Sequence, residues 1–139
     1  MAGKTNMRPM IFDDVRRCLE GDGWPVETLS EVTLRSRFRR GGRAFPLLVH
    51  AADEFVTFAV IPFARLPEDP DEAEPVLERL LRLNREINMA KFSVDDDGDV
   101  VLSVDYRLED LDPSEVRDAA DVLSFYAEKH HAEVAALAP

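Results

Sequence analysis

The sequence lacks the features that cross-link a protein, hold it in a membrane or direct its export. Cys18 is the only cysteine among its 139 residues, which excludes an intramolecular disulfide and a thiolate metal cluster. No segment approaches the roughly 18 uninterrupted apolar residues of a membrane span, and the first residues carry no apolar run long enough for a signal peptide. These absences predict a cytoplasmic protein in a reducing compartment.

Motifs of common catalytic and cofactor sites are also missing. The sequence contains no phosphate loop, no dinucleotide fingerprint and no nucleophile elbow. His130 and His131 are neighbours that point about 100° apart on a helix, so they cannot chelate one ion together. His130 is expected to pack as a hydrogen-bonded residue, His50 stands alone, and Cys18 lies on an apolar helix stripe. We therefore expect no enzyme, no cofactor and no metal, although carboxylates that only the fold brings together stay open.

Charge is unevenly distributed along the chain. The net charge is −11, yet residues 1–50 sum to +3 while residues 51–139 sum to −14. An acidic protein of this kind is a poor partner for nucleic acid over its whole surface. One local exception is the segment 35–43, which has five arginines in nine residues. It is interpreted as the outward face of a strand and its turn, or as a site for phosphate or an acidic protein.

The composition predicts a single domain, residues 1–139, because 45% of the residues are apolar and no tract is of low complexity. Helical spacing of apolar residues predicts a helix over 9–21. Period-two alternation then predicts a strand over 32–38, and two more strands follow at 45–49 and 55–63 as an antiparallel meander. Pro46 lacks a ladder donor, so the second strand should be an edge or carry a break at that end.

A second helix is expected after an acidic, proline-punctuated connection over 66–75. Its apolar residues cover an arc of about 160°, wider than the ~100° that one core contact needs. Asn84 and Asn88 fall in the same arc, where an unsatisfied amide costs about 1–3 kcal/mol. They should be tied to backbone or to a second chain, and capping of carbonyls near the helix end is an equal alternative.

The segment Asp95–Asp99, DDDGD, could be a calcium loop or a hairpin turn. With Gly98 at the sixth position of an EF-hand loop, Val104 falls where the bidentate glutamate is required. A three-residue loop 96–98 instead pairs Val94 with Val100 and places all apolar groups of both strands on one face. The sequence therefore favours a hairpin, with weak cation binding by the clustered carboxylates left open.

A third helix is predicted from Asp112 to about Leu137. Asp112 suits the N-cap, Pro113 the first position and Glu115 the third. Phe125 falls on the charged side of this helix, as an exposed aromatic or as part of a contact surface. The expected fold class is α+β, with a five-stranded antiparallel sheet and the order α-β-β-β-α-β-β-α.

Residues 80–98 read LLRLNREINMAKFSVDDDG. Together with the strand and long helix that follow, this segment resembles the bacterial YbjN family, also called sensory transduction regulators, through the pattern L-N-x-x-I-N-x-x-K-F. The element order is similar to the fold of type III secretion chaperones. The resemblance implies a homodimeric, non-catalytic chaperone-like or adaptor protein that binds a segment of a client protein.

Two sets of candidate site residues follow. The wide apolar arc of the second helix predicts a second contact, and a symmetric dimer is its simplest source. The dimer-interface candidates are Val76, Leu80, Leu83, Asn84, Ile87 and Asn88, of which the four apolar residues pack at this interface or against the sheet. Partner binding is predicted at Phe125, Arg35, Arg37, Arg39 and Arg40. The alternative function is a nucleic-acid-linked regulator that uses the basic strip from Arg35 to Arg43.

Overall fold

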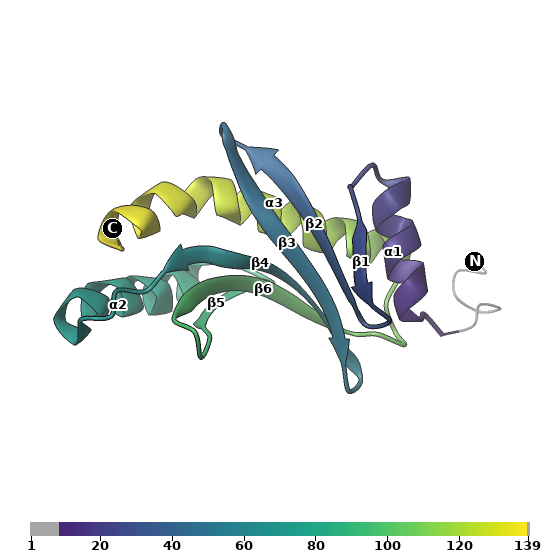
Figure 1. The fold of residues 1–139 in the computed structure, drawn as a ribbon, viewed down its shortest axis with the longest axis horizontal. Helices are drawn as coiled ribbons and strands as arrows, with labels where there is room; N and C mark the ends of the chain where they lie inside the picture. Colours follow the sequence, from purple (N-terminus) through teal and green to yellow (C-terminus); the bar gives the residue numbers. More distant parts are fainter. Residues whose placement is uncertain (1–8, 139) are drawn as a thin grey trace.

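The computed structural model describes residues 9–138, so the amino-terminal segment in which no signal peptide is predicted lies largely outside the described residues. Three helices and a six-stranded antiparallel sheet make up the fold (Figure 1). The elements are α1 (Phe12–Gly21), β1 (Glu27–Ser30), β2 (Thr33–Arg40), β3 (Arg43–Ala52), β4 (Phe55–Arg65), α2 (Pro70–Glu86), β5 (Lys91–Val94), β6 (Asp99–Arg107) and α3 (Pro113–Leu137).

The α+β class is confirmed, but the prediction of five strands is wrong. The additional strand is β1, whose four residues are all exposed. It therefore has no apolar alternation, which is the signal that predicts a strand. Val32, which was expected in the first strand, is exposed in the turn between β1 and β2.

The strand order in the sheet is β1-β2-β3-β4-β6-β5. The first four strands form a meander, and the β5–β6 hairpin is added after α2 so that β6 lies between β4 and β5 (Figure 1). Gly41 and Gly42 have φ angles of 60° and 78°, as the two-residue turn between β2 and β3 requires. The β3–β4 ladder covers only Leu48–Ala52, so β3 is unpaired on that side at Pro46, as predicted.

The core lies on one face of the sheet. α3 crosses this face, with α1 packed beside its first half and α2 beside its second half (Figure 1). A row of rings runs between the sheet and α3, from the segment before β1 to β5, with centroid spacings of 5.2–5.7 Å. Its members are Trp24, Phe38, Phe45, His131, Phe63 and Phe92.

The hairpin interpretation of DDDGD is confirmed. Val94 pairs with Val100 in the β5–β6 ladder, and Gly98 has a φ of 82°, a conformation that glycine adopts without strain. The Asp95 carboxylate accepts the N–H groups of Asp97 and Asp99, each at 2.9 Å. The Asp95 carboxylate thus stabilises the backbone of the turn itself, while Asp99 forms an ion pair with Arg65.

The second helix begins earlier than the expected connection allows. α2 starts at Pro70, and Asp69 caps it by accepting the N–H of Asp71 at 2.8 Å. Pro75 therefore lies inside the helix. α3 has the predicted start, because the Asp112 carboxylate accepts the N–H of Ser114 and Glu115 reaches back to the N–H of Asp112.

Candidate peptide-binding surface

The two edges of the sheet differ in whether another strand can be added. At the β5 edge, the Asn84 side chain donates to the Phe92 carbonyl at 3.0 Å and accepts the Phe92 N–H at 2.6 Å. An amide group of α2 therefore occupies both backbone groups that Phe92 turns outward. This contact confirms that Asn84 is tied to backbone, and it closes the β5 edge at Phe92.

The β2 edge is open over half of its length. β1 pairs with β2 only from Thr33 to Arg35. Alternate residues of an antiparallel strand form their backbone hydrogen bonds with the same neighbouring strand. Arg40 and Arg43 flank the two-residue turn, so Arg40 is hydrogen-bonded to β3, and the other even-numbered residues of β2 follow it. The bond from the Ala51 N–H to the Val32 carbonyl, 2.8 Å, continues this even-numbered series. Arg37 and Arg39 therefore direct their N–H and C=O groups away from β3, beyond the end of β1.

A groove lies beside this open edge, where the chain before β1 diverges from β2. Its volume is about 380 Å³. Ser36 contributes to its wall, is 5% exposed, and has a hydroxyl that is buried with no hydrogen-bond partner in the part of the chain that the structure describes. The other lining residues are Pro25, Val26, Glu27, Arg35, Arg37, Ala44, Phe45 and Pro46.

The four arginines predicted to bind a partner have different surroundings. Arg35 forms an ion pair with Glu27, its cross-strand neighbour on β1. Arg40 reaches α3, where it donates to Ser124 and to Glu128, both at 3.2 Å. Arg37 and Arg39 are exposed, and within residues 9–138 neither forms an ion pair. Two unpaired guanidinium groups thus accompany the open edge.

None of the three helices described in residues 9–138 covers the face of the sheet opposite α3 (Figure 1). Its middle is nevertheless apolar and shielded by neighbouring side chains, because Ala59 and Val101 are buried and Leu48 is half-buried. Ser103, which pairs with Ala59 across the β4–β6 ladder, is also buried. This small apolar area continues from β3 across β4 to β6 and is called the open face below.

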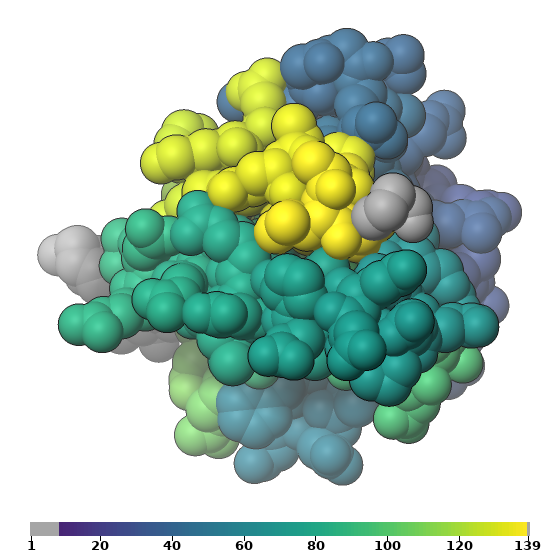
Figure 2. All heavy atoms as spheres, turned by 90° about the vertical axis from the view of Figure 1, so that its left-hand side faces the viewer, coloured from purple at the N-terminus to yellow at the C-terminus, as the bar shows by residue number. Residues whose placement is uncertain are grey.

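The predicted dimer-interface residues divide between the core and the surface. Asn84 is half-buried and Asn88 is exposed. The exposed apolar residues of α2 are Leu77, at 40%, and Leu81, at 71%. They lie one turn apart on a helix that is spread across one end of the molecule (Figure 2). The four apolar candidates belong to the core of this chain: Val76, Leu80, Leu83 and Ile87.

Phe125 is 51% exposed, as its position on the charged side of the helix predicts. Its ring is 5.3 Å from that of Tyr126, and the Lys129 ammonium lies 5.8 Å from its centroid. The Tyr126 hydroxyl accepts the backbone N–H of Asn88 at 2.9 Å. Phe125 thus lies at the border between α3 and the end of α2, far along the chain from the arginines of β2.

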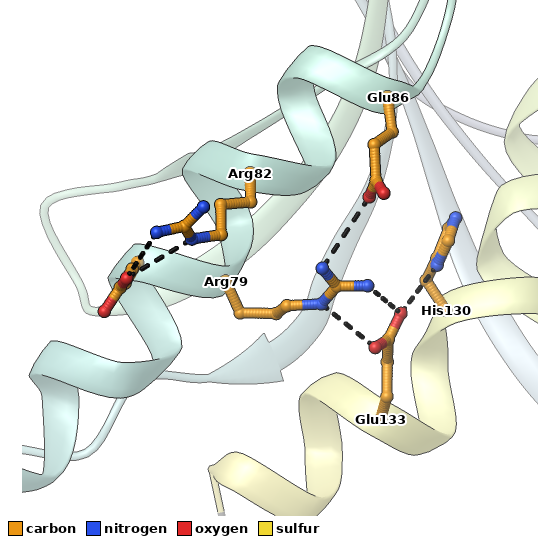
Figure 3. A network of polar contacts seen from close by, with 6 residues as sticks. Arg79, Arg82, Glu86, His130 and Glu133 are labelled. Atoms are coloured by element: carbon orange, nitrogen blue, oxygen red, sulfur yellow. Dashed lines mark hydrogen bonds and ion pairs between the residues drawn. The ribbon is translucent and has the colours of Figure 1, made fainter.

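A polar network connects α2 to α3 (Figure 3). The Arg79 guanidinium donates to both carboxylate oxygens of Glu133, at 3.0 and 3.3 Å, and lies 3.6 Å from Glu86. His130 Nδ1 is 2.8 Å from the same Glu133 carboxylate. The hydrogen bond from Arg79 is the main reason that the pKa of Glu133 lies below its ordinary value. His130 is buried against Tyr126, which confirms its interpretation as a hydrogen-bonded packing residue.

The remaining histidines and the cysteine are held by packing or by contacts within the fold. His131 packs between Phe45 and Phe63, and burial lowers its pKa, which favours the neutral ring. Burial raises the pKa of Cys18, so its thiol is the favoured form. His50 lies 2.7 Å from the Thr33 hydroxyl. Across residues 9–138 there is no cluster of three or more acidic, histidine or cysteine residues arranged to hold a metal ion.

A sequence model of a protein family matches residues 38–138, and the family is described as "T3SS (YopN, CesT) and YbjN peptide-binding chaperone 1". The chain belongs to this family. The match covers β3 to α3 and therefore includes the open face, Asn84 and Phe125. A comparison with curated proteins finds no match.

Solved structures share the fold. One is the heterodimeric ExoU–SpcU complex from the type III secretion system of Pseudomonas aeruginosa, with a TM-score of 0.59, 21% identity, and coverage of 88% of this chain and 95% of that chain. Another is YbjN of E. coli, described as a putative transcription regulator, with a TM-score of 0.63, 15% identity, and coverage of 89% and 96%. None of the helices described in residues 9–138 is long and apolar enough to cross a membrane.

Sequence reasoning missed three features of this surface. Ser36 occupies the core-facing position between Leu34 and Phe38, so its burial follows from the period-two pattern. The exposure of Leu77 and Leu81 has no such signal, because both lie inside the apolar arc of α2. The open face was missed because alternation shows which side chains share a face, and not which face the helices cover.

Proposed function

We propose that this protein is a non-catalytic chaperone or adaptor that holds an extended segment of a client protein in the cytoplasm. Membership of a peptide-binding chaperone family carries this proposal. The unpaired part of β2 and the half-buried Leu48 of the neighbouring strand support it, because an extended peptide needs backbone partners and shallow apolar contacts. A chain of the heterodimeric ExoU–SpcU complex has this fold.

The binding mode follows from the two surfaces. A client segment added as a strand at β2 would satisfy the outward backbone groups of Arg37 and Arg39. Its side chains would reach the groove on one side, and the rest of the client would continue over the open face past Leu48. An unfolded client offers both an extended backbone and apolar side chains, whereas a folded one hides them.

Binding of unfolded peptide tests this function. A library of overlapping 15-residue peptides from unrelated proteins would be immobilised, and the purified protein applied at low and at high salt. We expect a subset of peptides to retain the protein, and Leu48→Glu on the open face to reduce that retention. Leu137→Glu at the end of α3 is the matched control, because Leu137 is an exposed apolar residue outside both the open face and α2. Equal retention of the protein by all peptides, or retention by none, would contradict the function.

We further propose that the protein forms a homodimer through α2. Leu77 and Leu81 are the exposed apolar pair on that helix, while Asn84 closes the β5 edge and arginines occupy the β2 edge. Light scattering after size exclusion should give twice the chain mass for the wild type and a lower mass for Leu77→Lys combined with Leu81→Lys. Phe125→Ser is the control outside this patch. A folded dimer from the double variant would contradict the proposal.

The second candidate function is a nucleic-acid-linked regulator. The unpaired guanidinium groups of Arg37 and Arg39 favour it, while the net charge of −11 opposes it. It predicts binding to nucleic acid that falls steeply with salt and is lost when Arg37, Arg39 and Arg40 are all replaced by alanine. Binding of peptide but not of labelled DNA or RNA at 150 mM salt would exclude it.

A further inference from the structure

The open part of β2 combines two properties that together select a partner. Arg37 and Arg39 direct their backbone groups outward, and their side chains lie two residues apart on one face of the strand. Arg35, the next arginine on that face, is already paired with Glu27. The part of β2 beyond the end of β1 therefore carries two positive charges, on Arg37 and Arg39, that have no counterion from residues 9–138.

A second copy of this chain is a poor occupant of this edge. Antiparallel pairing of two β2 edges would bring Arg37 and Arg39 of one copy beside the same residues of the other, and like charges placed across strands are destabilising. An acidic segment would instead be stabilised by the arginines that repel a second copy. Opposite charges across neighbouring strands contribute about 0.2–1 kcal/mol a pair relative to an alanine pair.

The other side of an added strand would meet aromatic surface. Phe38 lies between Arg37 and Arg39 and points to the opposite face, where its ring packs at 5.7 Å from that of Trp24. Both residues are half-buried. A side chain between two acidic residues of the added strand would point toward these rings, because neighbouring residues in a strand alternate between faces. An apolar residue suits this position.

We propose that the β2 edge binds an extended client segment with the pattern acidic-apolar-acidic, paired antiparallel to β2 and in line with β1. The acidic residues lie opposite Arg37 and Arg39, and the intervening apolar residue lies beside Phe38. This inference rests on the proposed peptide-binding function and specifies the chemistry of the client. Antiparallel pairing continues the direction in which β1 already pairs with β2.

Fluorescence anisotropy with defined peptides tests the charge selection. The probe is a labelled nine-residue peptide that alternates glutamate with valine, and its counterpart replaces every glutamate with lysine. We expect Arg37→Glu combined with Arg39→Glu to weaken binding of the glutamate peptide about tenfold or more and to strengthen binding of the lysine peptide. Arg82→Glu combined with Arg85→Glu on α2 makes the same change in net charge and should alter the Kd by less than about twofold.

Methylated peptides test the strand pairing. In antiparallel pairing the residues opposite Arg37 and Arg39 exchange backbone hydrogen bonds with them, so N-methylation of the glutamates should abolish binding, while N-methylation of the valines should preserve it. Any other pattern would overturn this pairing. Thermal unfolding monitored by circular dichroism checks that each variant keeps its fold.

The outcomes separate this inference from the function on which it rests. If the wild type binds unfolded library peptides but does not distinguish the glutamate from the lysine peptide, the acidic specificity is wrong and peptide binding stands. The arginines would then serve only to keep the edge from pairing with other chains. If no extended peptide binds the wild type, both proposals fail.

Discussion

Replacing Asn84 by alanine should destabilise the protein more than its half-buried position on α2 indicates. The Asn84 amide makes two hydrogen bonds to one residue, Phe92, through its N–H and its C=O. Phe92 is 4% exposed and its ring packs on Phe63. Alanine removes both partners at once and leaves a backbone donor and acceptor without a protein partner at the edge of the sheet.

The magnitude follows from the burial of these groups. An ordinary hydrogen bond contributes about 0.5–1.5 kcal/mol net, and a buried donor or acceptor left unsatisfied costs about 1–3 kcal/mol. Because Asn84 is half-buried, water can enter the space that alanine leaves and satisfy part of the loss. We therefore expect Asn84→Ala to lower the free energy of unfolding by about 2 kcal/mol.

Urea unfolding monitored by circular dichroism measures this change, with Asn88→Ala as the control because Asn88 is exposed. Hydrogen exchange gives a local measure, since about 2 kcal/mol corresponds to a fall of roughly 30-fold in the protection of the Phe92 amide. A loss below about 0.5 kcal/mol, equal to that of the control, would refute the view that Asn84 closes the β5 edge.

Three further predictions concern the helices. Arg79→Met should lower the free energy of unfolding only slightly at pH 7, because the ion pair with Glu133 is screened by solvent. The pKa of Glu133 is lowered in the folded state, so this stabilisation should disappear as pH falls through that pKa, and a difference from wild type in urea unfolding that persists at low pH would contradict this. Leu83→Ala should lower the free energy of unfolding by about 2–5 kcal/mol because the side chain is fully buried, whereas Leu81→Ala should have little effect. Asp112→Ala should reduce the thermal midpoint through the loss of about 1 kcal/mol of capping, and an unchanged midpoint would exclude this role.

Local patterns were sufficient for most elements of this fold. Gly98 together with the alternation of Val94 and Val100 determined both the turn and the register of the β5–β6 hairpin, because a slip of one residue would have turned the apolar side chains of β6 to the other face. The start of α3 was equally local, since Asp112 and Glu115 satisfy N–H groups within one turn of the chain. β1 was missed because all its side chains are exposed, so only its pairing with β2 makes it a strand.

By itself, the sequence determined the fold class, the family resemblance and the residue types available for binding, because helix caps, tight turns and apolar periods depend on neighbours along the chain. Tertiary structure alone decided which of these residues are accessible. Asn84 could have faced a second chain, but the position of β5 directs it to Phe92. The arginines of β2 could all have been free, but β1 pairs with Arg35 and α3 with Arg40, which leaves Arg37 and Arg39 beside an open edge. These outcomes depend on contacts between segments far apart in the sequence, and an apolar period of two or 3.6 residues does not predict such contacts.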